Sequence, residues 1–241
     1  MPADTLLNGQ LGSIVNGITA TGALGTAAYG LVDTTKVFGG GVSRAGLGDI
    51  GAAVDPFILG FSQSAFGKAQ ILETLRANWL NGMAKGDQKA VAKSLIRLSL
   101  TPENARQLAA ATALDADRLT ATIGRIHAGE VLSPQDLNIV GQFDAVVSAR
   151  LDAGYERADQ RYRNMAKALS ALVAIVLAVV AGGLIFFARD PAKGIGDYLA
   201  SSTLPLAMLV GAISTPLAPI AKDLSSALVS AVGAVSSVRR R

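Results

Sequence analysis

Residues 168–188 read ALSALVAIVLAVVAGGLIFFA, a run of 21 residues without a charged side chain between Lys167 and Arg189. A helix needs about 20 apolar residues to cross a hydrocarbon core of about 30 Å. Twelve of these residues are Leu, Ile, Val or Phe, and they contribute on the order of −5 kcal/mol to insertion. A helix in a soluble core usually keeps a polar stripe, which this run lacks beyond Ser170. The sequence therefore predicts a membrane-spanning helix.

Two further charge-free runs lie on either side of this segment in the chain. Residues 198–221 contain Pro205, Pro216 and Pro219, which predict a kinked span because proline removes a backbone donor. A re-entrant or surface segment is the alternative. Residues 5–32, within an N-terminal segment 1–35, are diluted by Gly, Thr and Asn, and they predict a span or a re-entrant helix. The start of the chain lacks the basic region of a signal peptide.

Small side chains recur at every fourth position in all three runs. Such rows line one helix face and let helix backbones approach closely, which is how helices associate in lipid. The predicted packing residues are Gly22, Thr26 and Gly30; Ser170, Ala174, Ala178 and Gly182; and Ala207, Gly211 and Thr215. The sequence leaves open whether the partner helices belong to the same chain or to other copies.

Charges on the flanks of the spans predict the topology. Four bases, Arg157, Arg161, Arg163 and Lys167, precede residue 168, whereas the loop 189–197 carries two bases and two acids. The positive-inside rule places residues 33–167 and the C-terminus in the cytoplasm and the N-terminus outside, across what we expect to be a bacterial cytoplasmic membrane.

The C-terminal segment 222–241 ends in three arginines, and it predicts an interfacial helix or an extension of the last span. We expect Lys167, Arg239, Arg240 and Arg241 at lipid headgroups.

Between residues 32 and 168 the sequence is of ordinary polarity. Residues 36–67 read as a glycine-rich connector, in which Gly46, Gly48 and Gly51 match G-x-G-x-x-G. That motif is weak without a preceding strand, and no cofactor is expected. Residues 68–133 predict a cytosolic helical domain, and residues 134–188 predict a stalk helix that runs into the span. The apolar stripe of the stalk needs a partner, either the preceding helices or another copy. Its members are Val140, Phe143, Val147, Leu151, Tyr155, Ala158, Tyr162, Met165 and Leu169.

Residues 108–123 resemble a helix-turn-helix, with Ala113 at the turn and Leu119 and Ile123 facing inward. Arg118, Thr120 and Arg125 would then contact DNA. Residues 68–136 hold nine bases and seven acids, so the basic surface that DNA binding needs is faint. Nucleic acid is therefore not the expected partner.

Composition argues against most site chemistry. The chain has no cysteine, which excludes a disulfide scaffold and a cysteine zinc site, and His127 is its one histidine. We find no catalytic constellation and expect no enzyme and no metal. The sequence predicts an all-α membrane protein with two or three transmembrane helices, a cytosolic helical domain and a long stalk helix. The expected role is that of a self-assembling scaffold, a pore or a small subunit of a membrane complex. The alternative is a membrane-tethered regulator that binds DNA or a protein.

Overall fold

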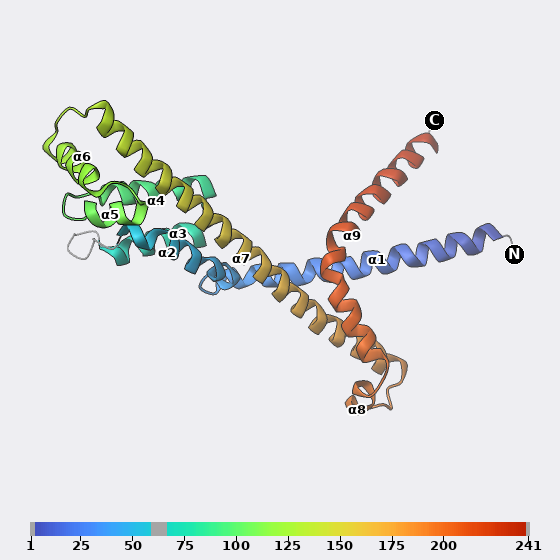
Figure 1. Cartoon of the computed structure of the whole chain (residues 1–241). Helices are drawn as coiled ribbons and strands as arrows, with labels where there is room; N and C mark the ends of the chain where they lie inside the picture. Colours follow the sequence, from blue (N-terminus) through green and yellow to red (C-terminus); the bar gives the residue numbers. More distant parts are fainter. Residues whose placement is uncertain (1–2, 59–66, 240–241) are drawn as a thin grey trace. The chain divides into compact units, whose positions relative to one another are not determined.

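The computed structural model describes the backbone of residues 3–58 and 67–239 and the side chains of residues 16–58, 67–221 and 223. Over this part of the chain the structure is helical and has no strand (Figure 1), which confirms the all-α prediction. The chain divides into two units. Unit 1 comprises residues 1–42 and 164–241, and unit 2 comprises residues 43–163. Helix α7 (Pro134–Arg189) contributes residues to both units.

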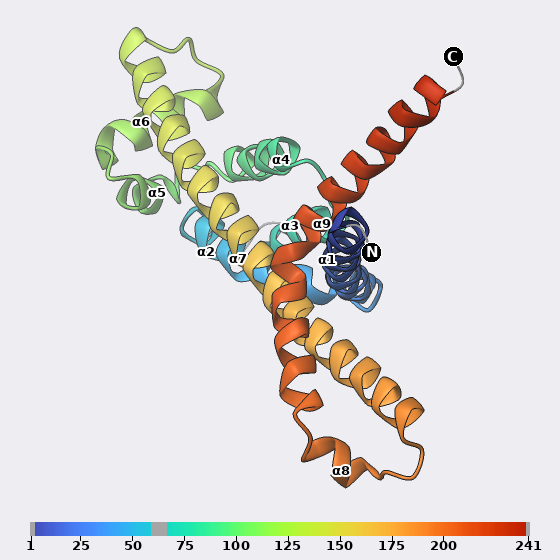
Figure 2. The ribbon, with the colours of Figure 1, turned by 90° about the vertical axis from the view of Figure 1, so that its right-hand side faces the viewer.

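Unit 1 contains three long helices. These are α1 (Ala3–Thr34), the C-terminal part of α7, and α9 (Thr203–Arg239). A loop that carries the short α8 (Ile195–Leu199) joins α7 to α9, and the two helices run side by side (Figure 1). Helix α9 holds Pro216 and Pro219 and changes direction along its length (Figure 2). The last apolar helix thus begins at Thr203, not at residue 198, because Tyr198 belongs to α8.

Three consecutive glycines end the first helical segment. After α1 and the 3-10 turn η1 (Thr35–Val37), Gly39, Gly40 and Gly41 adopt positive φ angles of 66°, 95° and 45°. A Cβ atom on Gly41 would lie 2.4 Å from the Thr35 carbonyl oxygen. Glycine is the residue that adopts this left-handed backbone without strain. The chain therefore turns sharply here before it enters unit 2.

Unit 2 begins within the predicted connector. After the 3-10 turn η2 (Gly41–Gly46), residues 47–58 form helix α2 (Leu47–Ile58). Its Val54, Phe57 and Ile58 are buried in the core of unit 2. The G-x-G-x-x-G glycines thus lie in helical segments, without the strand that a dinucleotide site requires.

The remaining helices of unit 2 follow one another with short connections. They are α3 (Lys68–Leu80), α4 (Lys85–Leu98), α5 (Ala105–Thr112), α6 (Ala116–Ala128) and the N-terminal part of α7.

The apolar stripe of α7 forms the core of unit 2. None of the side chains from Phe143 to Ala158 on this stripe is more than 2 % exposed; they are Phe143, Val147, Leu151, Tyr155 and Ala158. The Phe143 ring meets Phe57 edge to face at 6.5 Å, and Trp79 contacts Tyr155. The partner that the stripe needs is therefore the set of preceding helices in the same chain. Beyond this core, Met165 is 43 % exposed, so the stripe ends earlier than predicted.

A buried carboxylate fixes the start of α7. Asp136 Oδ2 accepts hydrogen bonds from the Ser133 backbone N–H (2.9 Å) and hydroxyl (2.6 Å), and Oδ1 accepts from Thr122 (2.9 Å). The Arg125 guanidinium lies 2.6 Å from both carboxylate oxygens. The Ser133 hydroxyl and N–H, with Thr122 and Arg125, hold the pKa of Asp136 well below its usual range. This capping arrangement joins α6 to α7.

The lowered pKa of Asp136 predicts acid sensitivity. An aspartate has a pKa of about 3.9 in an unfolded chain. The contribution of the Asp136 carboxylate to the free energy of unfolding is therefore complete above that pH and is lost as the pH falls further. We expect Asp136→Asn to lower the unfolding midpoint at neutral pH and to flatten its fall as the pH drops below about 4. The measurement is Trp79 fluorescence, because Trp79 is the only tryptophan and lies in unit 2.

The control for this experiment is Asp117→Asn, which breaks the exposed ion pair with Arg106. We expect it to leave the acid profile unchanged. Equal acid sensitivity in the wild type and in Asp136→Asn would contradict the prediction.

Candidate functional site

The candidate site is the region of unit 1 where α1, α7 and α9 pack together. Helices α7 and α9 approach each other at Gly211, where a Cβ atom would lie 2.5 Å from Ile175 Cα and 2.8 Å from the Ala174 carbonyl oxygen. Toward the loop, a Cβ on Gly182 would lie 3.0 Å from the Ala207 Cβ. These distances leave no room for a larger residue at 211. Backbone-to-backbone contact therefore sets the spacing of the two helices.

Helix α1 packs on α9 by the same means. A Cβ on Gly25 would lie 2.2 Å from the Ser214 carbonyl oxygen, and one on Gly22 would lie 2.0 Å from the Ala221 Cβ. Ala28 and Val32 continue the buried face of α1. As the residue number rises along α1 it falls along α9, so the two helices are antiparallel.

The structure brings most of the predicted packing residues together. Those buried or in close contact in unit 1 are Gly22, Ser170, Ala174, Ala178, Gly182, Ala207, Gly211 and Thr215. Thr26 and Gly30 are instead exposed, and a Cβ on Gly30 would meet nothing within 4 Å. A four-residue step overshoots a helical turn by about 40°. The four-residue row on α1 therefore turns away from the face that contacts α9. The contact with α9 continues through Gly25 and Ala28 instead.

Two members of the site, Gly25 and Tyr198, do not belong to the rows of small residues at four-residue spacing. Gly25 lies three residues from Gly22, so a search at four-residue spacing passes over it. Tyr198 of α8 is 5 % exposed, and its hydroxyl donates to the Val179 carbonyl oxygen (2.7 Å). Its ring lies against Gly183, where a Cβ would be 3.4 Å from the Tyr198 Cε1 atom. The Gly182-Gly183 pair in an otherwise bulky run was the available signal.

Hydroxyl groups supply the polar character of the contact. Ser214 Oγ donates to the Gly211 carbonyl oxygen (2.7 Å). The buried hydroxyls of Ser170 and Thr215 have no hydrogen-bond partner among the described residues. Pro216 and Pro219 also remove two N–H donors from α9. The contact is thus built from glycines, alanines and hydroxyl-bearing side chains.

A groove runs along the surface of the α1–α9 contact. It has a volume of about 440 Å³ and is lined by small side chains, namely Thr19, Gly22, Ala23, Thr26, Ala27, Ala218 and Ala221. Thr26 therefore lines this groove and does not lie at the close contact between α1 and α9. Of the predicted headgroup residues, Lys167 is exposed, whereas the side chains of Arg239, Arg240 and Arg241 lie outside the described residues.

The helix-turn-helix prediction concerns α5 and α6 of unit 2. Ala113 has a φ of 56° at the turn, and Leu119 and Ile123 are buried as expected. The side chains proposed to contact DNA are only partly available. Arg125 is bound to Asp136, and the Thr120 hydroxyl donates to the Ala116 carbonyl oxygen. The turn is present, but the positive surface beside it is further reduced.

The contact between α1 and α9 predicts a sharp difference between two glycines of one helix. Gly25→Ala places a methyl group against the Ser214 carbonyl, and we expect it to destabilise unit 1 by about 1–3 kcal/mol. Gly30→Ala meets open space, and we expect it to be neutral or stabilising by up to about 1 kcal/mol. The measurement is the loss of helical circular dichroism on heating the detergent-solubilised chain. Equal midpoints for the two variants would refute this packing.

Among the described residues, no group of three His, Cys, Asp or Glu side chains could hold a metal ion. No protein-family model, no curated protein and no solved structure matches this chain. Its function is therefore inferred from the contacts of its own helices.

Proposed function

We propose that this chain is an integral membrane protein with a structural role, anchored by the helices of unit 1. The observation that supports this most is the exposure of large apolar side chains on two helices long and apolar enough to cross a membrane. On α7 the exposed set is Leu172, Val176, Val180, Leu184 and Ile185, and on α9 it is Leu206, Met208, Leu209, Ile213 and Ile220. Water would penalise these surfaces, whereas lipid tails would solvate them.

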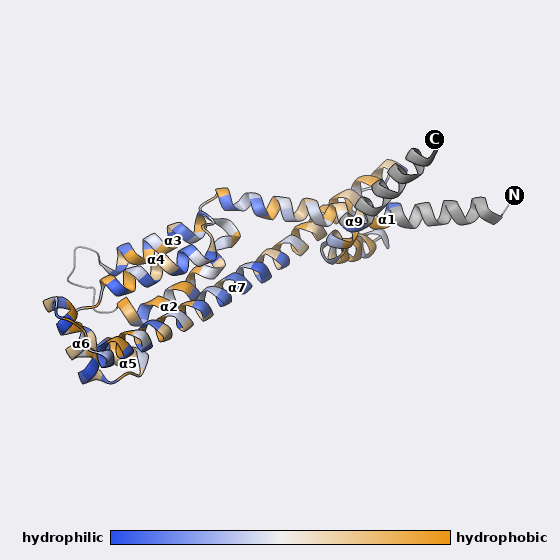
Figure 3. Ribbon diagram, turned by 90° about the horizontal axis from the view of Figure 1, so that it is seen from above, coloured by the Kyte–Doolittle hydropathy of each residue, from blue (hydrophilic) through white to orange (hydrophobic). Residues whose placement is uncertain are grey.

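The exposed apolar surface argues against a helix in a soluble core. Only 17 % of the most apolar window of α7, and 33 % of that of α9, is buried inside the protein. In Figure 3 the part of α7 beside α9 is coloured hydrophobic, whereas the helices of unit 2 carry hydrophilic stripes. Unit 2 therefore has the surface of a water-exposed domain, and unit 1 has the surface of a lipid-exposed one.

Basic residues near the ends of the span support a topology. Four of them, Arg157, Arg161, Arg163 and Lys167, precede the span; Arg161 pairs with Asp49 (3.0 Å) and Arg163 with Asp159 (2.5 Å). In the loop after α7, Lys193 pairs with Asp190 (3.1 Å). The loop carries two bases, whereas four precede the span, and the positive-inside rule counts Lys and Arg rather than net charge. We therefore place the loop outside and unit 2 in the cytoplasm.

The structural role rests on how the helices pack. Glycine contacts set the α1–α9 and α7–α9 spacing without any titratable group, as expected of a scaffold or of a subunit in a larger assembly. The groove that contains Thr26 is a surface on which another apolar helix could pack, which supports self-assembly. The competing role as a DNA-binding regulator is weaker, because Arg125 is neutralised by Asp136.

An arginine placed on the lipid-facing surface tests membrane anchoring. Val180 of α7 is 55 % exposed, and an arginine at a helix centre costs about 2.5–3.5 kcal/mol on the insertion scale. We expect Val180→Arg to reduce the fraction of chain that resists alkaline extraction from membranes. Val131→Arg, at a 96 % exposed position of unit 2, is the matched control and should have no effect. Release of the wild-type chain by alkaline extraction would contradict the proposal.

The absence of cysteine allows a direct test of topology. We expect a single cysteine at Lys193 in the loop and one at Asp117 in unit 2 to react with a membrane-impermeant maleimide from opposite sides of sealed vesicles. The cysteine at 117 should react from the cytoplasmic side. Labelling of both variants from the same side would exclude a hairpin with unit 2 in the cytoplasm.

A further inference from the structure

Charged side chains of α4 and α7 form a ladder along the surface of unit 2. Lys85 Nζ lies 2.8 Å from Glu156 Oε1, and Lys89 pairs with Asp152. At the far end, an Arg97 guanidinium nitrogen lies 2.6 Å from Asp144 Oδ1. Each four-residue step forward along α4 corresponds to a four-residue step backward along α7. The two helices are therefore antiparallel, with one rung of the ladder per helical turn.

The repeat is broken at one position. By the same four-residue step, Lys93 faces residue 148, which is a serine and not an acid. Lys93 instead reaches Asp144 (2.5 Å), which already binds Arg97. The Asp144 carboxylate thus forms ion pairs with both Lys93 and Arg97. Around Ser148, three cations (Lys89, Lys93 and Arg97) face two carboxylates (Asp144 and Asp152), which leaves an excess of positive charge.

At Asp144, the two cations that share the carboxylate stabilise its charged form. Burial alone would raise the pKa of Asp144, but the hydrogen bonds and charges of Lys93 and Arg97 outweigh it and lower the pKa. At the other end of the ladder, the hydrogen bond to Glu156 raises the pKa of Lys85. Both shifts favour the charged forms, the carboxylate of Asp144 and the ammonium group of Lys85.

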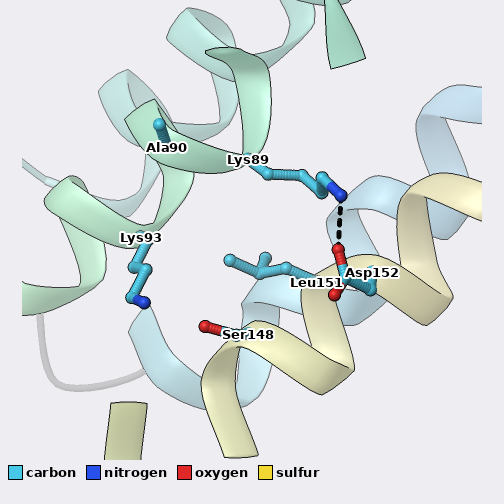
Figure 4. Close-up of a pocket in the computed structure, with 6 residues that line it drawn as sticks. All are labelled: Lys89, Ala90, Lys93, Ser148, Leu151 and Asp152. Carbon is cyan, nitrogen blue, oxygen red and sulfur yellow. Dashed lines mark hydrogen bonds and ion pairs between the residues drawn. The ribbon is translucent and has the colours of Figure 1, made fainter. Parts of the chain in front are cut away.

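A pocket lies at the broken position. Its volume is about 230 Å³, and it is lined by Lys89, Ala90, Lys93, Ser148, Leu151 and Asp152. Figure 4 shows Lys89 and Lys93 extending from α4 toward α7, with the Ser148 hydroxyl directed toward Lys93 and Leu151 between the two helices. The Lys89–Asp152 ion pair lies at one side of the pocket, away from Lys93. The space has room for several water molecules and hence for a small ion.

We propose that this pocket binds a small oxyanion of the class of inorganic phosphate, held by Lys93, Lys89 and the Ser148 hydroxyl. Ammonium and hydroxyl groups are donors, and a tetrahedral oxyanion offers several acceptor oxygens. The Asp152 carboxylate is neutralised by Lys89, so the attraction is strongest beside Lys93. The bound anion supplies the negative charge that the repeat otherwise lacks at position 148. This site is independent of the proposed membrane role, because all its residues lie in unit 2.

The test is the thermal unfolding of the full-length chain in detergent, followed by Trp79 fluorescence. Phosphate is titrated against chloride at constant ionic strength, so that general screening is the same in both series. We expect phosphate, and not chloride, to raise the unfolding midpoint. At a concentration ten times the dissociation constant, the ratio of folded to unfolded protein should rise about elevenfold.

Variants locate the effect at the pocket. Ser148→Glu places a carboxylate in the broken rung, and we expect it to raise the midpoint without phosphate and to abolish the response to phosphate. Lys93→Gln should also abolish the response. Lys68→Gln removes the same charge from the Lys68–Asp55 pair elsewhere in unit 2 and is the matched control, which should respond as the wild type does.

Three results would overturn the proposal: a wild-type midpoint that phosphate does not raise, a full response that survives in Lys93→Gln, or a response that Lys68→Gln loses equally. If Lys93→Gln does not fold, Ser148→Glu alone decides, because a full phosphate response with a carboxylate already in the rung would exclude this site.

Discussion

The constraint on which the rest of the structure depends is the charge-free surface of α7 between Lys167 and Arg189. The side chains of Leu172, Val176, Val180, Leu184 and Ile185 are exposed on the outside of unit 1, and no helix in the described part of the chain covers them. A surface of this kind is stable only in an apolar environment. The proposed membrane role, the position of the charges at the ends of the run and the choice of small residues inside it all follow from this one property.

Lipid removes the usual reason for helices to associate, because lipid tails are as apolar as leucine. Close contact between backbones must then provide the attraction, and bulky side chains would prevent it. In the proposed membrane environment, this accounts for the contact of Gly211 of α9 with Ile175 and of Gly25 of α1 with the Ser214 carbonyl. Where an aromatic ring does enter, as at Tyr198, it lies against Gly183 and its hydroxyl is satisfied by the Val179 carbonyl.

In unit 2, the same helix α7 buries its apolar side chains and exposes charged ones. The N-terminal part of α7 buries one apolar stripe, from Phe143 to Ala158, and turns its acids toward the lysines of α4. Exposed ion pairs contribute little each, about 0–1 kcal/mol, so the ladder sets the register of α4 on α7 more than it stabilises the unit. The single rung without an acid is therefore informative, because it leaves positive charge next to a pocket.

The sequence by itself determined the long apolar helix, the stripe of α7 and most of the small residues of unit 1. These features are periodic within one helix, and helical geometry turns such spacing directly into a face. The Ser133-Pro134 pair is a helix-start signal, and α7 begins at Pro134, where the Ser133–Asp136 capping arrangement is local. The sequence could not show that α2 completes the core of unit 2, since the glycines around it are typical of a connector.

Only the tertiary structure decided which faces meet. In the structure, Gly25 lies at the α1–α9 contact, whereas Thr26 and Gly30 do not. The α7 stripe packs against helices of its own chain, and Ser148 lies opposite Lys93. The physical reason is that each of these depends on the register between two helices. That register is fixed by packing between residues far apart in the sequence, which the spacing of residues within one helix does not contain.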